Sequence, residues 1–122
     1  MKYMLLVYMN EQAMTDEERE HCYVESAQLT QDLSANGQYL GAGPLHSVST
    51  ATSVRVRDDR RLVTDGPFAE TREQLGGYYL IEAKDLDEAI EIAERVPPVR
   101  YGTIEIRPVM AIPGLPASEA NP

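Results

Sequence analysis

The order of apolar and polar residues along this chain changes several times between strand-like and helix-like periods. Residues 3–9 form an apolar run without alternation, which predicts a strand buried on both faces. Residues 78–81 form a second run of this kind, directly after two glycines. Residues 103–107 alternate between apolar and polar side chains, as expected for a strand with one buried face.

The first predicted helix begins after Thr15 and ends near Gly37. Thr15 and Glu18 have the spacing of a capping box, and Asn36-Gly37 is a typical left-handed helix end. The inward stripe of this helix is narrow and consists mostly of small side chains, namely Cys22, Ser26, Leu29 and Leu33. His21 lies beside the stripe and is expected to be solvated, since no second histidine follows one turn later.

A second helix is predicted after the capping pair Asp85 and Glu88. Its apolar positions recur at spacings of three and four residues, at Leu86, Ala89, Ile90 and Ala93. Residues 39–45 read as a strand with glycines that mark a bulge or a close approach. Residues 53–57 and 61–64 flank Asp58-Asp59 and predict a hairpin.

The resulting order is strand, helix, strand, hairpin, strand, helix, strand. This order predicts an α+β, ferredoxin-like sandwich, with a mostly antiparallel sheet and two helices on one face. Two helices cover only one side of such a sheet, whereas residues 4–9 and 78–81 are apolar on both faces. A second copy of the chain is the simplest cover for the open face, so we expect a homodimer with its sheets packed face to face.

Composition narrows the function classes. The formal net charge of −9 argues against nucleic acid and against an anionic membrane, although Arg55, Arg57, Arg60 and Arg61 form a local basic group. The single Cys22 excludes an internal disulfide and is expected to be a buried thiol. No motif for a cofactor or a metal ion is present. Without a leader-like segment or a membrane-length apolar run, a cytoplasmic protein is expected.

The densest group of candidate functional residues is the turn from Thr64 to Glu73. Gly66 precedes Pro67 and is expected to be extended, and Phe68 is expected to anchor the turn to the core. Asp65 is either a turn cap or an acid–base group. The candidate acid–base residues are Asp65, Glu70 and His46, and the candidate ligand contacts are Gly43, Pro44, Gly66, Pro67, Phe68 and Arg72.

A family resemblance emerges from the same stretch. Residues 63–79 resemble the signature of the DGPF branch of the YCII-related domain family, in the sequence Val63-Thr64-Asp65-Gly66-Pro67-Phe68-Ala69-Glu70-Thr71-Arg72-Glu73-Gln74-Leu75-Gly76-Gly77-Tyr78-Tyr79. Residues 1–6, 41–44 and 105–109 also match in place and order. The resemblance covers residues 1–112 as one domain and leaves 113–122 as an expected flexible tail.

The resemblance implies the dimeric α/β-barrel superfamily. Some relatives are fused to sigma factors, and a few wider YCII members act on small aromatic compounds. The wider group pairs a helix histidine with an aspartate, but that helix position falls near Ser26 here, so the pair does not carry over. Two hypotheses follow. The chain either binds a small organic molecule near the turn, with lyase- or isomerase-like acid–base chemistry, or is a non-catalytic interaction or sensor module associated with transcription regulation.

Overall fold

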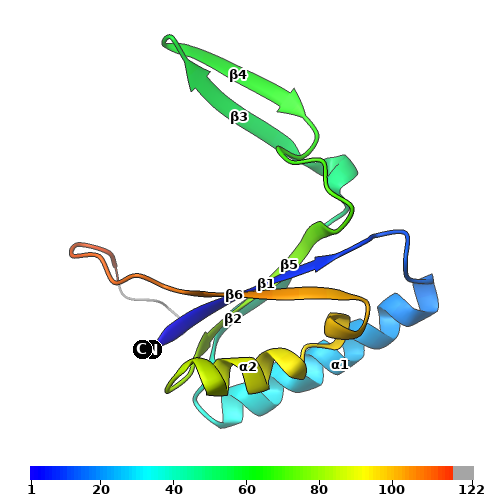
Figure 1. Ribbon diagram of the computed structural model, residues 1–122, viewed down its shortest axis with the longest axis vertical. Coiled ribbons are helices and arrows are strands. Elements are labelled where there is room, and N and C mark those ends of the chain that lie inside the picture. Colours follow the sequence, from blue (N-terminus) through cyan, green and yellow to red (C-terminus); the bar gives the residue numbers. More distant parts are fainter. Residues whose placement is uncertain (117–122) are drawn as a thin grey trace.

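The computed structural model describes residues 1–116, as an antiparallel sheet with both long helices on one side and a projecting hairpin on the other (Figure 1). The strands are β1 (Lys2–Met9), β2 (Tyr39–Pro44), β3 (Thr52–Arg57), β4 (Arg60–Asp65), β5 (Gln74–Glu82) and β6 (Gly102–Pro108). The helices are α1 (Asp16–Ala35) and α2 (Leu86–Glu94), with short 3-10 turns η1 (Val48–Thr50) and η2 (Pro97–Arg100).

The main sheet has the strand order β2-β5-β1-β6, and each neighbouring pair is antiparallel. The two central strands, β1 and β5, are therefore adjacent, although they are far apart in the sequence. The predicted ferredoxin-like α+β fold is confirmed. The hairpin β3–β4 is an insertion between β2 and β5 and forms a separate two-stranded sheet.

The first helix forms where its capping residues predict it. The Thr15 hydroxyl accepts from the Glu18 amide at 3.1 Å, and the Thr15 amide donates to the Glu18 carboxylate at 3.0 Å. These two bonds satisfy backbone donors that an uncapped helix would leave free. At the other end, Gly37 has a φ of +71°, the left-handed conformation that stops the helix.

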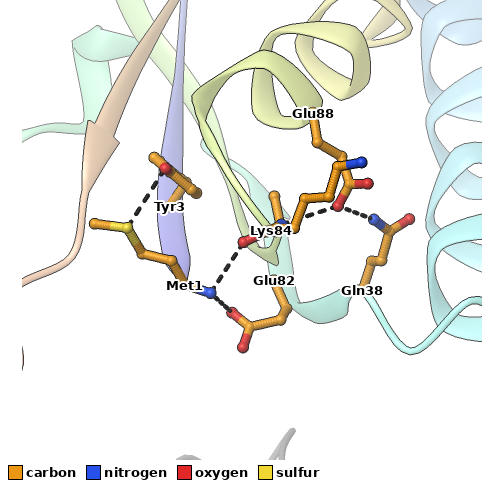
Figure 2. Close-up of polar contacts among 7 residues, drawn as sticks. Met1, Tyr3, Gln38, Glu82, Lys84 and Glu88 are labelled. Atoms are coloured by element: carbon orange, nitrogen blue, oxygen red, sulfur yellow. Dashed lines mark hydrogen bonds and ion pairs between the residues drawn. The ribbon is translucent and has the colours of Figure 1, made fainter.

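The second helix begins with a variant of the expected capping pair, and Figure 2 shows the contacts of Glu88 with Lys84 and Gln38. Asp85 accepts from the Glu88 amide at 2.9 Å, as predicted. The Glu88 carboxylate accepts from the Lys84 amide instead of the Asp85 amide, and from the Gln38 side chain, each at 3.0 Å. Glu88 therefore links the start of α2 to the residue that precedes β2.

The core lies between the helices and one face of the sheet. Leu5, Leu33, Ile81 and Val96 are completely buried there. The register places Leu5 between Tyr79 on β5 and Ile106 on β6, so all three side chains point toward the helices. The helix face of the sheet is the more apolar one, and α1 and α2 cover it.

The other face of the sheet is uncovered. Met4 pairs with Leu80, and Leu6 pairs with Tyr78, so these four side chains share the face that points away from the helices. Tyr78 is 38% exposed, and the other three are half-buried. Within residues 1–116, no helix packs over them (Figure 1).

The hairpin β3–β4, which we call the arm, extends on the side of the sheet opposite the helices (Figure 1). Its two-residue turn is Asp58-Asp59, as predicted, and both residues have a positive φ, +51° and +61°. This geometry is the type I′ turn that matches strand twist. At its root, the Gly66 amide donates to the Ala51 carbonyl at 2.7 Å, and the Ser53 hydroxyl donates to the Gly66 carbonyl at 2.8 Å.

Three further observations concern the first residue, the C-terminal end and the hydropathy of the helices. The Met1 amino group donates to the Ala83 carbonyl at 2.9 Å and lies 3.0 Å from a Glu82 carboxylate oxygen (Figure 2). Residues 113–116 are exposed, and the rest of the expected tail, 117–122, lies outside the described residues. Neither described helix is long and apolar enough to cross a bilayer.

The core predicts a sharp contrast between two positions on α1. Leu33→Ala should lower the free energy of unfolding by about 2–5 kcal/mol, because it empties a completely buried site. Val24→Ala on the outer face, where the side chain is 70% exposed, should change it by less than about 0.5 kcal/mol. Urea denaturation of both variants measures the difference, and equal losses would contradict the packing described above.

Candidate functional site

A cavity of about 820 Å³ lies between α1 and the β2–β5 side of the sheet. This volume is in the range of cavities that hold small organic ligands. The wall on α1 is formed by Arg19, Cys22, Tyr23, Ser26, Ala27 and Thr30. The sheet side and the mouth contribute Val7, Met9, Tyr39, Ala42, Gly43, Pro44, Leu45, His46, Ser47, Gly76, Gly77, Tyr78 and Tyr79.

The cavity follows from side-chain size along the inward stripe of α1. Leu29 and Leu33, in the second half of the helix, are buried and fill the space against the sheet. Cys22 and Ser26, in the first half, are too small to do so. The sheet opposite is also built from small residues, so the helix and the sheet leave a gap here.

Glycines let β2 and β5 approach each other closely beside the cavity. A Cβ added to Gly77 would lie 3.1 Å from the Gly43 carbonyl oxygen, and one added to Gly43 would lie 3.2 Å from the Tyr78 ring. The pairing of β2 with β5 also contains a register shift between Tyr39 and Gly41. The bulge, one of the two features expected from the glycine-rich strand, is therefore present.

Glu11 fixes the segment that carries His46. Its carboxylate accepts from the Ser47 hydroxyl and from the Val48 amide, each at 3.0 Å. The Arg19 guanidinium donates to the Glu11 carbonyl at 2.9 Å and lies 3.3 Å from Asp16. The loop after β1 and the segment after β2 are thereby tied together at the cavity mouth.

Polar groups inside the cavity come from α1 and β5. The Tyr79 side chain is buried, and burial raises the pKa of its phenol. A hydrogen bond with the Ser26 hydroxyl has the smaller, opposite effect and lowers this pKa. Tyr79 is therefore protonated at neutral pH and can donate a hydrogen bond. Burial also raises the pKa of the Cys22 thiol, so Cys22 is a buried thiol, as predicted, and not an activated nucleophile.

The residues predicted to form the site separate into two groups. Gly43, Pro44 and His46 lie together in the cavity lining. The residues of the central turn lie at the root of the arm and do not line this cavity, namely Asp65, Gly66, Pro67, Phe68, Glu70 and Arg72. Within residues 1–116, no hydrogen bond reaches the carboxylate of Asp65 or Glu70, so the turn-cap interpretation of Asp65 is wrong.

Two other expectations for the turn are also wrong. Phe68 does not anchor the turn to the core, because it is 76% exposed, and the Arg55 guanidinium lies over its ring, 4.9 Å from the centroid. Gly66 has a φ of +108°, a conformation that glycine adopts readily. The extended conformation expected before a proline has a negative φ instead. Glu73, another acidic residue of the motif, does have a partner. Its carboxylate accepts a hydrogen bond from the Thr103 hydroxyl at 2.9 Å.

Sequence reasoning missed most of the cavity wall. Glu11, Arg19 and Thr30 line it, yet none belongs to a recognisable motif, and Tyr79 ends the family signature without having been singled out as a site residue. The available signal was the run of small residues on the inward stripe of α1 opposite a glycine-rich strand. Ser26 carried a second signal, since the family resemblance places the helix histidine of the wider group near this position.

The YCII-related domain family matches residues 1–113. The chain belongs to the YCII-related domain family. An uncharacterised protein of Rhizobium meliloti (strain 1021) is 36% identical to it over 118 residues, which are 89% of this chain and 92% of that protein. The family expectation from the sequence is thus confirmed across the described fold.

A solved structure with the same fold is the 5-chloro-2-hydroxyhydroquinone dehydrochlorinase of Burkholderia phenoliruptrix AC1100, in complex with 2,5-dihydroxybenzoquinone. It superimposes on this YCII-related chain with a TM-score of 0.58 at 16% sequence identity. The alignment covers 90% of this chain and 94% of the dehydrochlorinase chain. At this identity the likeness establishes the fold alone.

The raised pKa of Cys22 predicts a pH dependence of stability. The folded thiol has a higher pKa than the unfolded thiol, which titrates near ~8.5. Its contribution to stability is therefore complete below that pH and is lost as the pH rises. The free energy of unfolding should fall between about pH 8 and pH 10, and Cys22→Ala should flatten this fall. Urea denaturation across this range tests it; equal slopes in both proteins would contradict it.

Proposed function

We propose that this YCII-related chain binds a small, partly apolar organic molecule in the cavity between α1 and the sheet, with acid–base chemistry of a lyase or isomerase type. The observation that carries the proposal is the cavity itself. It combines a ligand-sized volume with apolar walls and a few convergent polar groups, as small-molecule sites usually do. The dehydrochlorinase with this fold, whose structure holds a dihydroxybenzoquinone, supports a ring-shaped ligand.

His46 is our candidate for the acid–base group. It lies in the cavity lining, and an imidazole exchanges a proton near neutral pH. Tyr79, held in its protonated form by burial, would donate a hydrogen bond to a ligand oxygen. A base and a hydrogen-bond donor in one cavity are what proton abstraction next to a carbonyl requires.

The homodimer expected from the sequence is part of this proposal. The face that carries Met4, Leu6, Tyr78 and Leu80 is apolar at its centre and has no cover within residues 1–116. A second copy packed on it would bury these side chains on both chains at once. The cytoplasmic location expected from the sequence remains a prediction.

A non-catalytic interaction module is the second candidate, and the arm favours it. The arm exposes apolar side chains to solvent and takes no part in the cavity. Binding of a ligand without its conversion would support this alternative over the acid–base role.

The cavity proposal predicts selective losses of binding. With 2,5-dihydroxybenzoquinone as the probe, Ser26→Leu should weaken binding at least about tenfold by filling the cavity, whereas Gln31→Leu, on the exposed side of α1, should not. Titration calorimetry measures both. If no member of a panel of quinones and phenols binds the wild type, the ring-shaped ligand is excluded, and equal binding by both variants would place the ligand elsewhere.

The two histidines offer a matched pair for the acid–base role. His46→Gln should abolish conversion of a bound substrate while retaining most of the binding, because glutamine keeps polarity but takes up no proton. His21→Gln, outside the cavity lining, should change neither. Turnover and binding measured in all three proteins check this, and conversion retained in His46→Gln would contradict the acid–base role.

The dimer proposal predicts a sedimenting mass of about twice the 13.6 kDa of one chain at micromolar concentration. Leu6→Lys should give a monomer, because it places a charge at the centre of the uncovered face. Val24→Lys, on the outer face of α1, is the control and should remain dimeric. A wild type that sediments at 13.6 kDa would rule the dimer out.

A further inference from the structure

The arm has no partner of its own within residues 1–116. All twelve of its strand residues except Ser53 are exposed, including Val54 and Val56 at 62% and Val63 at 54%. Its contacts with the rest of the chain are concentrated at the root, where Ser53 and Gly66 are bonded. A two-stranded hairpin alone in water is at best marginally stable, so an arm of this kind is expected to lie against another body.

The two faces of the arm differ in chemistry. On one face, Arg55 covers the Phe68 ring, and Arg57 and Arg60 are a directly opposed pair. On the other face, Val54 pairs directly with Val63, and Val56 follows two residues along the same strand, opposite Arg61. The valine face thus presents three adjacent apolar side chains that are exposed in the part of the chain that the structure describes, whereas the opposite face carries Arg55, Arg57 and Arg60.

The arm extends on the same side of the main sheet as its uncovered face (Figure 1). The helices lie on one side of the main sheet, and the arm extends on the other side (Figure 1). A body that covers the open face is therefore next to the arm. The arm strands are six residues long, about 20 Å, which is roughly twice the spacing between two packed sheets. An arm of this length can reach past the sheet of a second copy.

We infer that the valine face of each arm lies along the body of a second copy of this chain, so that two arms clasp the dimer. The inference rests on the homodimer proposed above and adds to it a second, separate contact surface. In a two-fold dimer the contact occurs twice, once for each arm.

The area needed by a stable dimer supports this arrangement. Four strands of six to nine residues outline a sheet face of about 400–500 Å². A typical stable interface buries about 800 Å² on each partner. The arm adds exposed apolar side chains on the same side of the main sheet as the uncovered face (Figure 1), which enlarges the interface that a second copy can form.

Charge also favours a second copy as the occupant. The arm, residues 52–65, carries four arginines and three aspartates, whereas the rest of the chain carries seven basic and seventeen acidic residues. A slightly basic arm is attracted to the strongly acidic body of another copy. Nucleic acid would meet the same arginines but would be repelled by that acidic body.

The first test compares the two faces of the arm. The triple variant Val54→Ser, Val56→Ser, Val63→Ser should raise the dimer dissociation constant at least about tenfold, because it removes apolar contacts at two symmetric places. Leu62→Ser, on the opposite face and 46% exposed, should change it less than about twofold. Sedimentation at a series of concentrations gives both constants, and circular dichroism checks that each variant is folded.

The second test locates the arm directly. In a Cys22→Ala background, Asp59→Cys at the arm tip is labelled with a benzophenone, in dimers mixed from isotopically heavy and light chains. Crosslinks between heavy and light peptides are expected, from the tip to the body of the partner. Crosslinks confined to one chain would overturn the inference, and so would a photolysed dimer that yields none between chains.

The outcomes separate the arm contact from the dimer itself. A wild-type monomer overturns both. A dimer that Leu6→Lys dissociates, but that the valine triple variant leaves intact, overturns the arm contact alone. Binding of a fluorescent single-stranded RNA 20-mer that is lost in Arg57→Ala, Arg60→Ala and retained in the valine triple variant would assign the arm to nucleic acid instead.

Discussion

The structure depends on how α1 meets the sheet. Leu29 and Leu33 fill the interface along half of the helix and, with Leu5 and Ile81, form the dry part of the core. One and two turns earlier, Ser26 and Cys22 leave the interface unfilled. The same helix therefore holds the fold together at one end and opens a ligand-sized space at the other. A larger side chain at Ser26 would fill the space along the first half of the helix.

Hydrogen bonds between polar groups hold the mouth of the cavity together, whereas much of its wall is apolar. Glu11 uses both carboxylate oxygens to hold the segment that carries His46, and Arg19 holds the Glu11 backbone in turn. These groups are partly exposed, so each contact contributes little to stability by itself. Their effect is geometric, because they fix the segment that carries His46 at the cavity mouth.

The elements of the fold could be predicted from the sequence because their causes are local. The capping residues Thr15 and Asp85 and the strand alternation act over a few residues. The cavity could not, because Glu11 and Ser47 meet across 36 positions and Ser26 meets Tyr79 across the core. The motif around Asp65 misled for a related reason. A dense set of charges with one phenylalanine reads as a packed turn, but nothing local reveals that Phe68 is exposed and lies against Arg55.

The position of the arm in the topology has a consequence for how this family can diversify. β2 and β5 are antiparallel neighbours, and the Leu45 amide donates to the Gly76 carbonyl at 2.9 Å, which closes the connection at its base. Between them, His46 and Ser47 line the cavity and Gln74 and Leu75 pair with β1, but the arm is an excursion from what would otherwise be a simple hairpin. Such an excursion can lengthen, shorten or change its surface without altering the register of the sheet. Choice of partner can thus drift independently of the cavity, and homologues with one pocket can differ in their assembly.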